Sequence, residues 1–233
     1  TELPILSIKD KNYIIYAESY DSKESENHCK YVFNKNENIF AKINIHKYPY
    51  KKEKLSVNSD RVFLTEKNKR RVQQENTIMK TILSKVRPQP LFNSPFIQPL
   101  RSKITSGYGI QRTFNGKRKS IHLGIDFRAR KKTPIISTNA GKVVLAKELF
   151  KLGKAVIIDH GLGIYSSYGH LSEIKVNEGD FVTRKQVVGL SGMTGRANGP
   201  HLHWGISVQG HWINGMSLIR SLETKLEKNK EIK

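Results

Sequence analysis

The pattern of apolar and polar residues changes along the chain. Residues 1 to about 65 hold short apolar runs, rich in β-branched and aromatic residues and separated by Asn, Asp and Lys clusters: YIIYAES, YVFN, IFAKINIHKY and RVFL. Runs of this kind are typical of short β-strands. From Thr65 to Val86 apolar residues recur at helical intervals without Gly or Pro, and Thr65 is a suitable N-cap. The pattern predicts a β-rich accessory domain, residues 1–86, that ends in a helix.

A second pattern follows a proline-rich stretch. RPQPLFNSPFIQP, residues 87–99, contains four prolines, so we expect it to end the helix and form an extended linker. Glycines then become frequent and strand-like runs return, namely KITSGYG, TPIIST, GKVVLAKE, KAVIIDHG, IYSSYGHL, VVGLSG and HLHWGISV. Short strands joined by Gly-containing turns predict a second all-β domain, residues 100–218. Residues 219–233 are predicted to form a C-terminal helix and charged tail. The fold class is therefore expected to be mainly β.

The charge of the chain narrows the class of partner. Lys and Arg total 41 against 20 Asp and Glu, which gives a formal net charge of +21. Residues 1–99 contribute 18 basic and 11 acidic residues, and residues 100–233 contribute 23 and 9. Such a field favours polyanionic partners, such as nucleic acid, an anionic membrane surface or an acidic wall polymer. Charge by itself does not choose among them.

Three other features concern membrane spans, processing of the N-terminus and cysteine chemistry. No apolar run approaches the roughly 18 residues that a membrane span needs, so no transmembrane segment is expected. The chain begins at Thr1 rather than Met, which indicates either a removed signal peptide or a trimmed chain. The single cysteine, Cys29, excludes an intramolecular disulfide framework and a multi-cysteine zinc site.

Five of the eight histidines lie between positions 122 and 203. IHLGIDF places His122 four residues before Asp126, and on a straight strand they would lie about 13 Å apart. The two can share a metal only if the chain curls around Gly124, where glycine permits unusual backbone angles. His160, at a strand end, is expected to play a structural role, such as a hydrogen bond to a backbone carbonyl.

NGPHLHW supplies two further candidates. Residues two apart on a strand point to the same side, about 6.6 Å apart, so one of His201 and His203 could ligate a metal while the other faces the water bound to it. With His122 and Asp126, one histidine of this pair makes a three-ligand set, which leaves a fourth tetrahedral position for water, as in catalytic zinc sites. His170 and His201 are the groups available to move protons near neutral pH.

Four motifs in this order resemble one family. SIHLGIDF, SSYGHLSEIKVNEGDFV, VVGLSGMTG and NGPHLHW resemble the lysostaphin-type (LytM-like, peptidase family M23) zinc metalloendopeptidases, from about Ile104 to Leu218. The preceding SGYGIQR is similar to the version in Gram-negative periplasmic members. The resemblance implies a groove in an antiparallel β-sheet, and Zn²⁺ held by His122, Asp126 and His203. It also implies that His170 and His201 flank the water bound to the metal. Lys132 stands where the family usually has glycine.

The resemblance also implies a function. We expect a periplasmic or cell-envelope hydrolase, with its signal peptide removed, that cleaves peptide crosslinks of peptidoglycan as a D,D-endopeptidase on D-Ala–meso-diaminopimelate bonds. The basic surface would favour anionic wall polymers. A D,D-carboxypeptidase acting on the same stem peptides, and a catalytically inactive wall-binding module of the same fold, are the alternatives. Residues 1–86 are predicted to cover or orient the groove.

Two unrelated functions are weaker interpretations. VNEGDFVTRKQVVG resembles the hairpin of lipoyl- and biotinyl-carrier domains, but no lysine has the context of a modified residue. The charge suggests nucleic-acid binding, but the lysines are scattered and no basic patch is interleaved with aromatic residues. No sequence-specific nucleic-acid partner is therefore expected.

Overall fold

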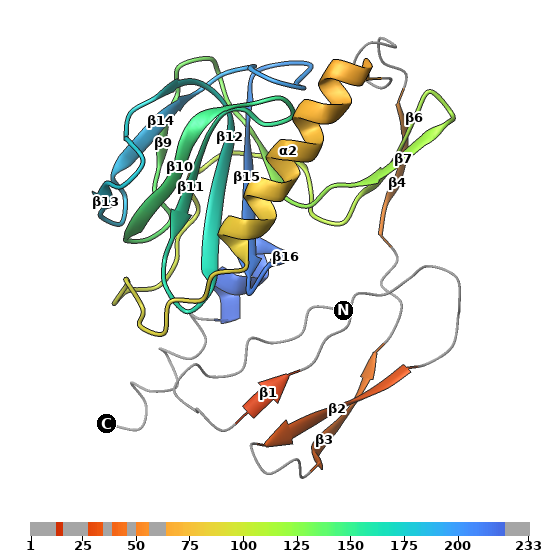
Figure 1. Ribbon diagram of the computed structural model, residues 1–233, viewed down its shortest axis with the longest axis vertical. Coiled ribbons are helices and arrows are strands. Elements are labelled where there is room, and N and C mark those ends of the chain that lie inside the picture. The colour runs from red at the N-terminus through yellow and green to blue at the C-terminus, as the bar shows by residue number, and fades with distance from the viewer. Residues whose placement is uncertain (1–12, 16–27, 35–38, 46–49, 56–63, 222–233) are drawn as a thin grey trace. The chain divides into compact units, whose positions relative to one another are not determined.

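The computed structural model describes residues 13–15, 28–34, 39–45, 50–55 and 64–221 (Figure 1). The chain forms two compact units, residues 1–50 and 51–233. In the first unit, β1 (Tyr13–Ile15), β2 (His28–Asn34) and β3 (Ile39–Ile45) form an antiparallel sheet in the order β1-β2-β3. These strands coincide with three of the predicted runs, whereas most of the fourth run, RVFL, lies outside the described residues.

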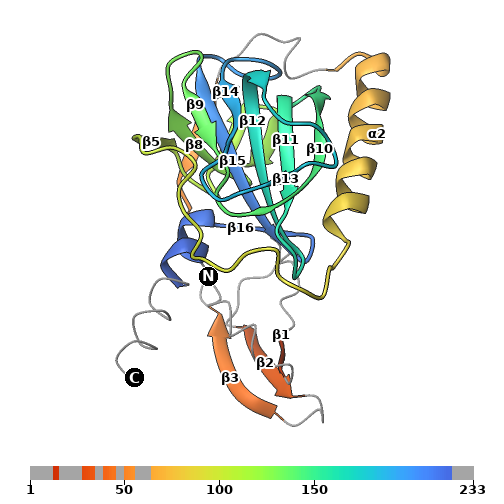
Figure 2. The ribbon, with the colours of Figure 1, turned by 90° about the vertical axis from the view of Figure 1, so that its left-hand side faces the viewer.

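The second unit is built on a sheet of ten strands. Its main path runs β13-β10-β11-β12-β15-β8-β5, while β14 pairs with β12 and β9, and β16 pairs with β15 (Figure 2). The strands are β5 (Ile104–Ser106), β8 (Ile125–Arg128), β9 (Pro134–Ile136), β10 (Gly141–Leu149), β11 (Gly153–Asp159), β12 (Ile164–Ile174), β13 (Phe181–Val182), β14 (Val187–Ser191), β15 (His201–Val208) and β16 (His211–Ile213). The predicted mainly β fold is confirmed.

The predicted helix is also present. Helix α2 spans Glu66–Leu83, and the Thr65 hydroxyl caps it by accepting a hydrogen bond from the Asn68 N–H at 3.3 Å. Leu83 is only 4% exposed and packs into a cluster made by Leu145, Leu149, Ala155, Ile157 and Tyr165 of the sheet. Helix α2 therefore lies alongside the sheet (Figures 1 and 2) and belongs to the compact unit that contains it, whereas the sequence grouped the helix with the N-terminal strands.

The proline-rich segment packs against the second unit and is hydrogen-bonded to it. Phe96 is fully buried and meets the His160 ring edge-on, with ring centroids 5.1 Å apart. The Leu91 N–H donates to the His160 carbonyl at 2.8 Å, and the Ile97 N–H donates to the Thr138 carbonyl at 3.0 Å. The segment thus packs against the second unit.

A small sheet beside the main one was not predicted. Here β4 (Lys52–Leu55) pairs in parallel with β6 (Gln111–Phe114), which in turn pairs antiparallel with β7 (Arg118–Ile121). The parallel pairing places Glu53 opposite Arg112. A segment that precedes α2 thereby becomes the edge strand of a hairpin that leads into the His122 region.

The C-terminal end of the second unit is only partly described. Residues 215–221 are helical, and the rest of the predicted C-terminal helix and tail lies outside the described residues. No helix among the described residues is long and apolar enough to cross a membrane.

Lys132 adopts a left-handed backbone conformation, with φ of 67°. This region is favourable for glycine and strained for a residue with a Cβ atom. The turn before β9 thus keeps the conformation that a glycine would allow, although a lysine stands there.

Candidate metal centre and active site

Three neighbouring strands of the main sheet bring the candidate residues together. His203 on β15 lies directly opposite Asp126 on β8, and the backbone position beside His170 on β12 lies opposite His203 from the other side. Directly opposed residues of an antiparallel pair project from the same face of the sheet. His201, two positions before His203, shares that face. The sheet register therefore gathers Asp126, His201 and His203 on one face. His170 follows Gly169 and would point to the other face in a regular strand, but its left-handed backbone, with φ of 61°, lies at an irregularity of β12 that interrupts this alternation.

His122 reaches the same place from outside the sheet. It follows β7 directly, and the chain bends at Gly124 before β8 begins. The curl expected around Gly124 is present, but it does not use a left-handed backbone angle, because Gly124 has no positive φ. Glycine is needed for space instead: a Cβ atom there would lie 2.6 Å from Cε1 of His203 and 2.7 Å from the Trp204 carbonyl oxygen.

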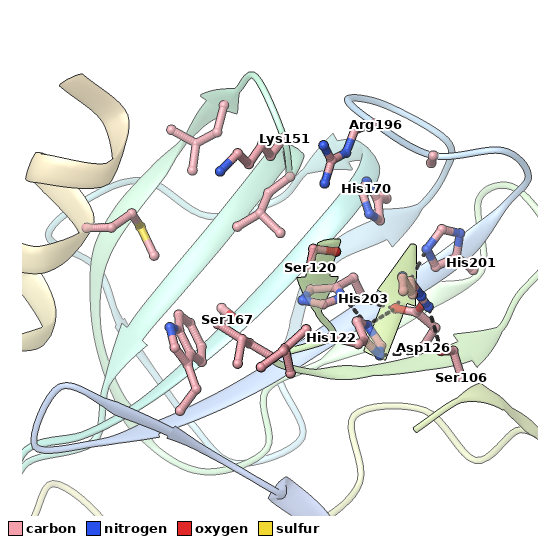
Figure 3. A pocket seen from close by; sticks show the side chains of 18 of the residues that line it. Ser106, Ser120, His122, Asp126, Lys151, Ser167, His170, Arg196, His201 and His203 are labelled. Carbon is pink, nitrogen blue, oxygen red and sulfur yellow. Dashed lines mark hydrogen bonds and ion pairs between the residues drawn. The ribbon is translucent and has the colours of Figure 1, made fainter. Parts of the chain in front are cut away.

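The side-chain atoms of His122, Asp126 and His203 converge on one point (Figure 3). His122 Nε2 lies 3.0 Å from Asp126 Oδ1, and His203 Nδ1 lies 2.9 Å from the same oxygen. The two ring nitrogens are 3.2 Å apart. Ligands at about 2.0–2.1 Å from a tetrahedral zinc ion lie about 3.3 Å from one another, so these spacings suit such an ion. Two nitrogens and one oxygen are also ligands that zinc accepts.

The surroundings orient the rings and the carboxylate. His122 Nδ1 lies 2.7 Å from the Gly107 carbonyl oxygen, to which it donates when protonated there, so that Nε2 keeps its lone pair for a metal. Burial alone would raise the pKa of the Asp126 carboxyl, but its contacts with the His122 and His203 rings hold that pKa well below its usual value. Asp126 is therefore ionised, as a metal ligand must be.

His170 and His201 flank the three converging side chains. Their ring centroids are 4.7 Å apart, and the His170 centroid is 5.9 Å from that of His203. His170 Nδ1 lies 2.8 Å from the Thr194 carbonyl oxygen, and His201 Nδ1 lies 2.8 Å from the Gly199 carbonyl oxygen. Because each Nδ1 donates to a carbonyl, each neutral ring carries its proton acceptor at Nε2.

Both the backbone and the environment of His170 are unusual. Its φ is 61°, in the left-handed region, and the side chain is buried. Burial first, and then the neighbouring His203 and His201 rings, lower the pKa of His170 to about 3. Burial likewise lowers the pKa of His203, although Asp126 acts in the opposite direction. Both imidazoles are therefore neutral at neutral pH, the form that binds a metal or accepts a proton.

His160 has the structural role that the sequence suggested. Its Nδ1 lies 2.7 Å from the Ala140 carbonyl oxygen, and its Nε2 accepts from the Ser166 hydroxyl at 2.7 Å. The ring is fully buried, and that burial lowers its pKa to about 4. His160 thus ties the start of β10 to β12 and lies outside the cluster of converging side chains.

A groove of about 1060 Å³ contains all five candidate residues. It extends past them to α2, where Asn76, Met79 and Lys80 contribute to its wall, and to the β6–β7 hairpin. Lys151 and Arg196 line it next to His170, as Figure 3 shows. Part of the predicted 1–86 region thus lines the groove, through α2 and Glu53 of β4.

Sequence reasoning missed the residues that surround Asp126. Ser106 and Arg112 lie within SGYGIQR, which carries part of the family resemblance, but no role was predicted for either. Arg112 Nη2 donates to Ser106 Oγ at 2.5 Å and to Asp126 Oδ2 at 3.3 Å. The position of these two residues in a recognisable motif was the signal that could have singled them out.

Comparison with known proteins shows which family part of the chain resembles. Residues 120–215 match the model of peptidase family M23, so this part of the chain is similar to that family. It is 42% identical over 100 residues to the peptidoglycan DD-endopeptidase ShyA of Vibrio cholerae, a stretch that covers 43% of this chain and 23% of the relative. The chain spans only 23%, 37% and 33% of the length of three curated relatives that it matches.

Solved structures agree in fold. A crystal structure of a peptidase M23 from Pseudomonas aeruginosa matches with a TM-score of 0.63 at 26% identity, covering 84% of this chain and 74% of that one. A zinc-containing peptidase from Vibrio cholerae matches with a TM-score of 0.50 at 32% identity, covering 55% and 40%. The mainly β architecture is therefore similar to that of these two peptidases.

Proposed function

We propose that the protein is a zinc-dependent hydrolase that cleaves peptide crosslinks of peptidoglycan, as a D,D-endopeptidase on D-Ala–meso-diaminopimelate bonds. One observation carries the proposal: three ligand atoms converge within 3.2 Å of one another, and two imidazoles flank them in the same groove. The family match supports the reaction class, and the relative named a peptidoglycan DD-endopeptidase supports the substrate.

His122, Asp126 and His203 would hold the zinc ion. When bound, zinc lowers the pKa of a coordinated water toward about 7 and polarises the scissile carbonyl. The Gly107 carbonyl fixes the ring of His122, and the bend at Gly124 leaves room for the ring of His203. These contacts hold the ligands in place before the metal arrives, which limits the cost of ordering them.

His170 and His201 would handle the protons of the reaction. Each has its acceptor at Nε2, because each Nδ1 is occupied by a carbonyl. One ring would accept the proton of the attacking water, and a protonated ring would stabilise the developing oxyanion or supply a proton to the leaving amine. Because both rings present Nε2 as the acceptor, either one could act as the base.

The charge distribution supports an anionic polymer as substrate. Residues 1–50 contain seven basic and seven acidic residues, so the whole formal net charge of +21 resides in the unit that carries the groove. Lys151 and Arg196 place two of these cations beside His170. A positive field raises the local concentration of a negatively charged polymer and the rate of encounter. A periplasmic or cell-envelope location follows from the substrate as part of the same proposal.

A D,D-carboxypeptidase is the second candidate. Lys151 and Arg196 could bind the terminal carboxylate of a pentapeptide stem, which an exopeptidase must recognise. The length of the groove, which continues from the candidate ligands to α2, favours a substrate that extends beyond the cleaved bond and hence the endopeptidase.

A pair of purified muropeptides tests the choice between the two activities. The protein, loaded with zinc, is incubated with a crosslinked tetrapeptide dimer and separately with a pentapeptide monomer. The proposal predicts conversion of the dimer to monomers at a greater kcat/KM than removal of the terminal D-Ala. Preferential trimming of the pentapeptide would replace it with the carboxypeptidase, and the His203→Ala protein should act on neither.

A further inference from the structure

A guanidinium group lies behind the carboxylate of Asp126. Arg112 Nη2 is 3.3 Å from Asp126 Oδ2 and 2.5 Å from Ser106 Oγ. The Ser106 hydroxyl in turn lies 3.4 Å from His122 Nδ1. Both side chains of the ion pair are shielded from solvent, at 21% exposed for Arg112 and 11% for Asp126. Arg112 therefore contacts one candidate ligand directly and reaches a second through a single hydroxyl.

The two oxygens of Asp126 face different partners. Oδ1 meets His122 Nε2 and His203 Nδ1, whereas Oδ2 meets the guanidinium of Arg112. A carboxylate can bind a metal through one oxygen or through both. A charge-assisted hydrogen bond to Oδ2 holds the plane of the carboxylate and occupies the lone pair that a second metal contact would need.

We propose that Arg112 is a positioning residue that keeps Asp126 a one-oxygen ligand, and thereby keeps the fourth position of the metal open for water. The inference rests on the proposed zinc site and adds to it a reason for that site's coordination number. A second metal–oxygen contact from Asp126 would raise the coordination number and crowd the position that the reacting water needs.

Glu53 extends this arrangement to a segment outside the family match. Its Oε2 lies 3.6 Å from Arg112 Nε, an atom that is buried and has no hydrogen-bond partner among the described residues. Glu53 is held opposite Arg112 by the parallel pairing of β4 with β6. Glu53 therefore links β4 to the candidate metal site. Its negative charge faces the guanidinium group of Arg112 that contacts Asp126.

If Arg112 acted through its charge alone, substitutions would give a different result from the one expected for direct contact with Asp126. Arg128 carries the same charge into the same groove from the exposed end of β8, two residues beyond Asp126. If Arg112 acted only through its field, then the loss of either arginine would change the metal site to a similar extent. If it acts by holding Oδ2, the effect belongs to Arg112 and is shared in part by Glu53.

Substitution with Co²⁺ gives a readout that does not depend on catalysis. Four-coordinate Co²⁺ absorbs visible light far more strongly than five- or six-coordinate Co²⁺, so the spectrum reports the coordination number. Wild type, Arg112→Gln, Arg112→Lys, Glu53→Gln and Arg128→Gln are loaded with Co²⁺, and their zinc affinities are measured by competition with a chelator. Tryptophan fluorescence verifies that each variant is folded.

The expected result is a strong visible band per bound ion in wild type and in Arg128→Gln. Arg112→Gln should lose most of this band and bind zinc about 10-fold more weakly. Glu53→Gln and Arg112→Lys should show smaller changes in the same direction, and Arg112→Lys decides the matter if Arg112→Gln does not fold. A wild-type spectrum in Arg112→Gln or Arg112→Lys, or equal changes in Arg128→Gln, would overturn the inference. Failure of the wild-type protein to bind one ion would instead overturn the zinc site itself.

Discussion

His201 and His203 lie two positions apart on β15 and share one face of the sheet, yet their rings are used in opposite ways. His203 turns Nδ1 to Asp126 Oδ1 at 2.9 Å, whereas His201 commits Nδ1 to the Gly199 carbonyl oxygen and keeps Nε2 3.8 Å from the same carboxylate oxygen. One strand therefore presents a candidate ligand and a candidate proton acceptor side by side, and substitution should separate these two roles.

Loss of a ligand should remove both metal and activity. In His203→Ala, His122→Ala and Asp126→Ala, only two of the three converging side chains remain, and two ligands hold zinc far more weakly than three. We expect less than one zinc ion per chain by elemental analysis and no detectable hydrolysis. Stoichiometric zinc in any of these three proteins after dialysis would exclude the substituted residue from the ligand set.

Loss of a flanking imidazole should spare the metal. His170→Ala and His201→Ala retain all three converging side chains, so zinc content should equal that of wild type. The rate of crosslink cleavage should fall by about 10²–10⁴-fold, the usual contribution of general acid–base catalysis. A kcat within a factor of two of wild type in either protein would remove that histidine from the proposed mechanism.

Gly124 should be intolerant of even one methyl group. A Cβ atom there would meet the ring of His203 at 2.6 Å, so Gly124→Ala must displace a candidate ligand. Gly199→Ala is the matched control, since a Cβ at that position meets no atom within 4 Å and the carbonyl to His201 is kept. Chelator competition should show zinc bound at least about 10-fold more weakly in Gly124→Ala and unchanged in Gly199→Ala. Equal affinities in the two proteins would contradict the packing argument.

Stability should depend on pH through His160. Its pKa is about 4 in the folded protein and 6.5 when unperturbed, so the unfolded chain binds the proton more readily. The contribution of neutral His160 to the free energy of unfolding is therefore complete above about pH 6.5. It is lost as the pH falls toward 4, which lowers the free energy of unfolding by about 3 kcal/mol. His160→Gln does not titrate and should lack this part of the pH dependence.

Urea unfolding of both proteins between pH 4 and 7, with chelator present to exclude zinc release, measures the difference. Trp204 and Trp212 are the two tryptophans of the chain, and both lie in the second unit, so their fluorescence reports that unit alone. Parallel curves of unfolding free energy against pH for wild type and His160→Gln would disprove the assignment.

Replacement of Lys132 by glycine, which the M23 peptidases that this chain resembles usually have there, should make the protein more stable. Its φ of 67° is strained for lysine and unstrained for glycine, so Lys132→Gly should raise the free energy of unfolding by about 1 kcal/mol. Lys131→Gly, the neighbouring change at a residue without positive φ, should give no gain. The same fluorescence-detected urea titration distinguishes them, and equal effects of the two glycines would show that strain at Lys132 is negligible.

The parts of the fold that follow from local pattern were predictable. Strand-like runs located β1 to β3, β5, β9 to β12, β14 and β15, and helical spacing with Thr65 as N-cap located α2. The docking of α2 through Leu83 and the pairing of β4 with β6 were not predictable, because both depend on contacts between segments far apart in the chain. A four-residue strand of sequence KEKL carries no apolar alternation that would indicate its partner.

The candidate site, too, was predictable only in part. The family resemblance named five residues, and the structure brings all five into one groove: Asp126, His201 and His203 through the sheet register, His122 through the bend at Gly124, and His170 through the irregularity in β12. Their roles as ligands and proton carriers remain predictions, which the variants above test. Spacing predicted that the chain must curl at Gly124, but not that the need was room for His203. Arg112 could have been singled out by its place in SGYGIQR, but not its role, because neither residue type nor spacing reveals a guanidinium placed behind a carboxylate. Glu53 lies in no motif, so nothing in the sequence indicated it.

Digestion of purified sacculi with and without a zinc chelator tests the central claim most directly, with mass analysis of the released muropeptides. The account predicts that the zinc-loaded protein converts crosslinked dimers into monomers cut between D-Ala and diaminopimelate, that the chelator stops this reaction, and that added zinc restores it. Unchanged dimers under all three conditions, or cleavage that persists in the chelated protein, would contradict it.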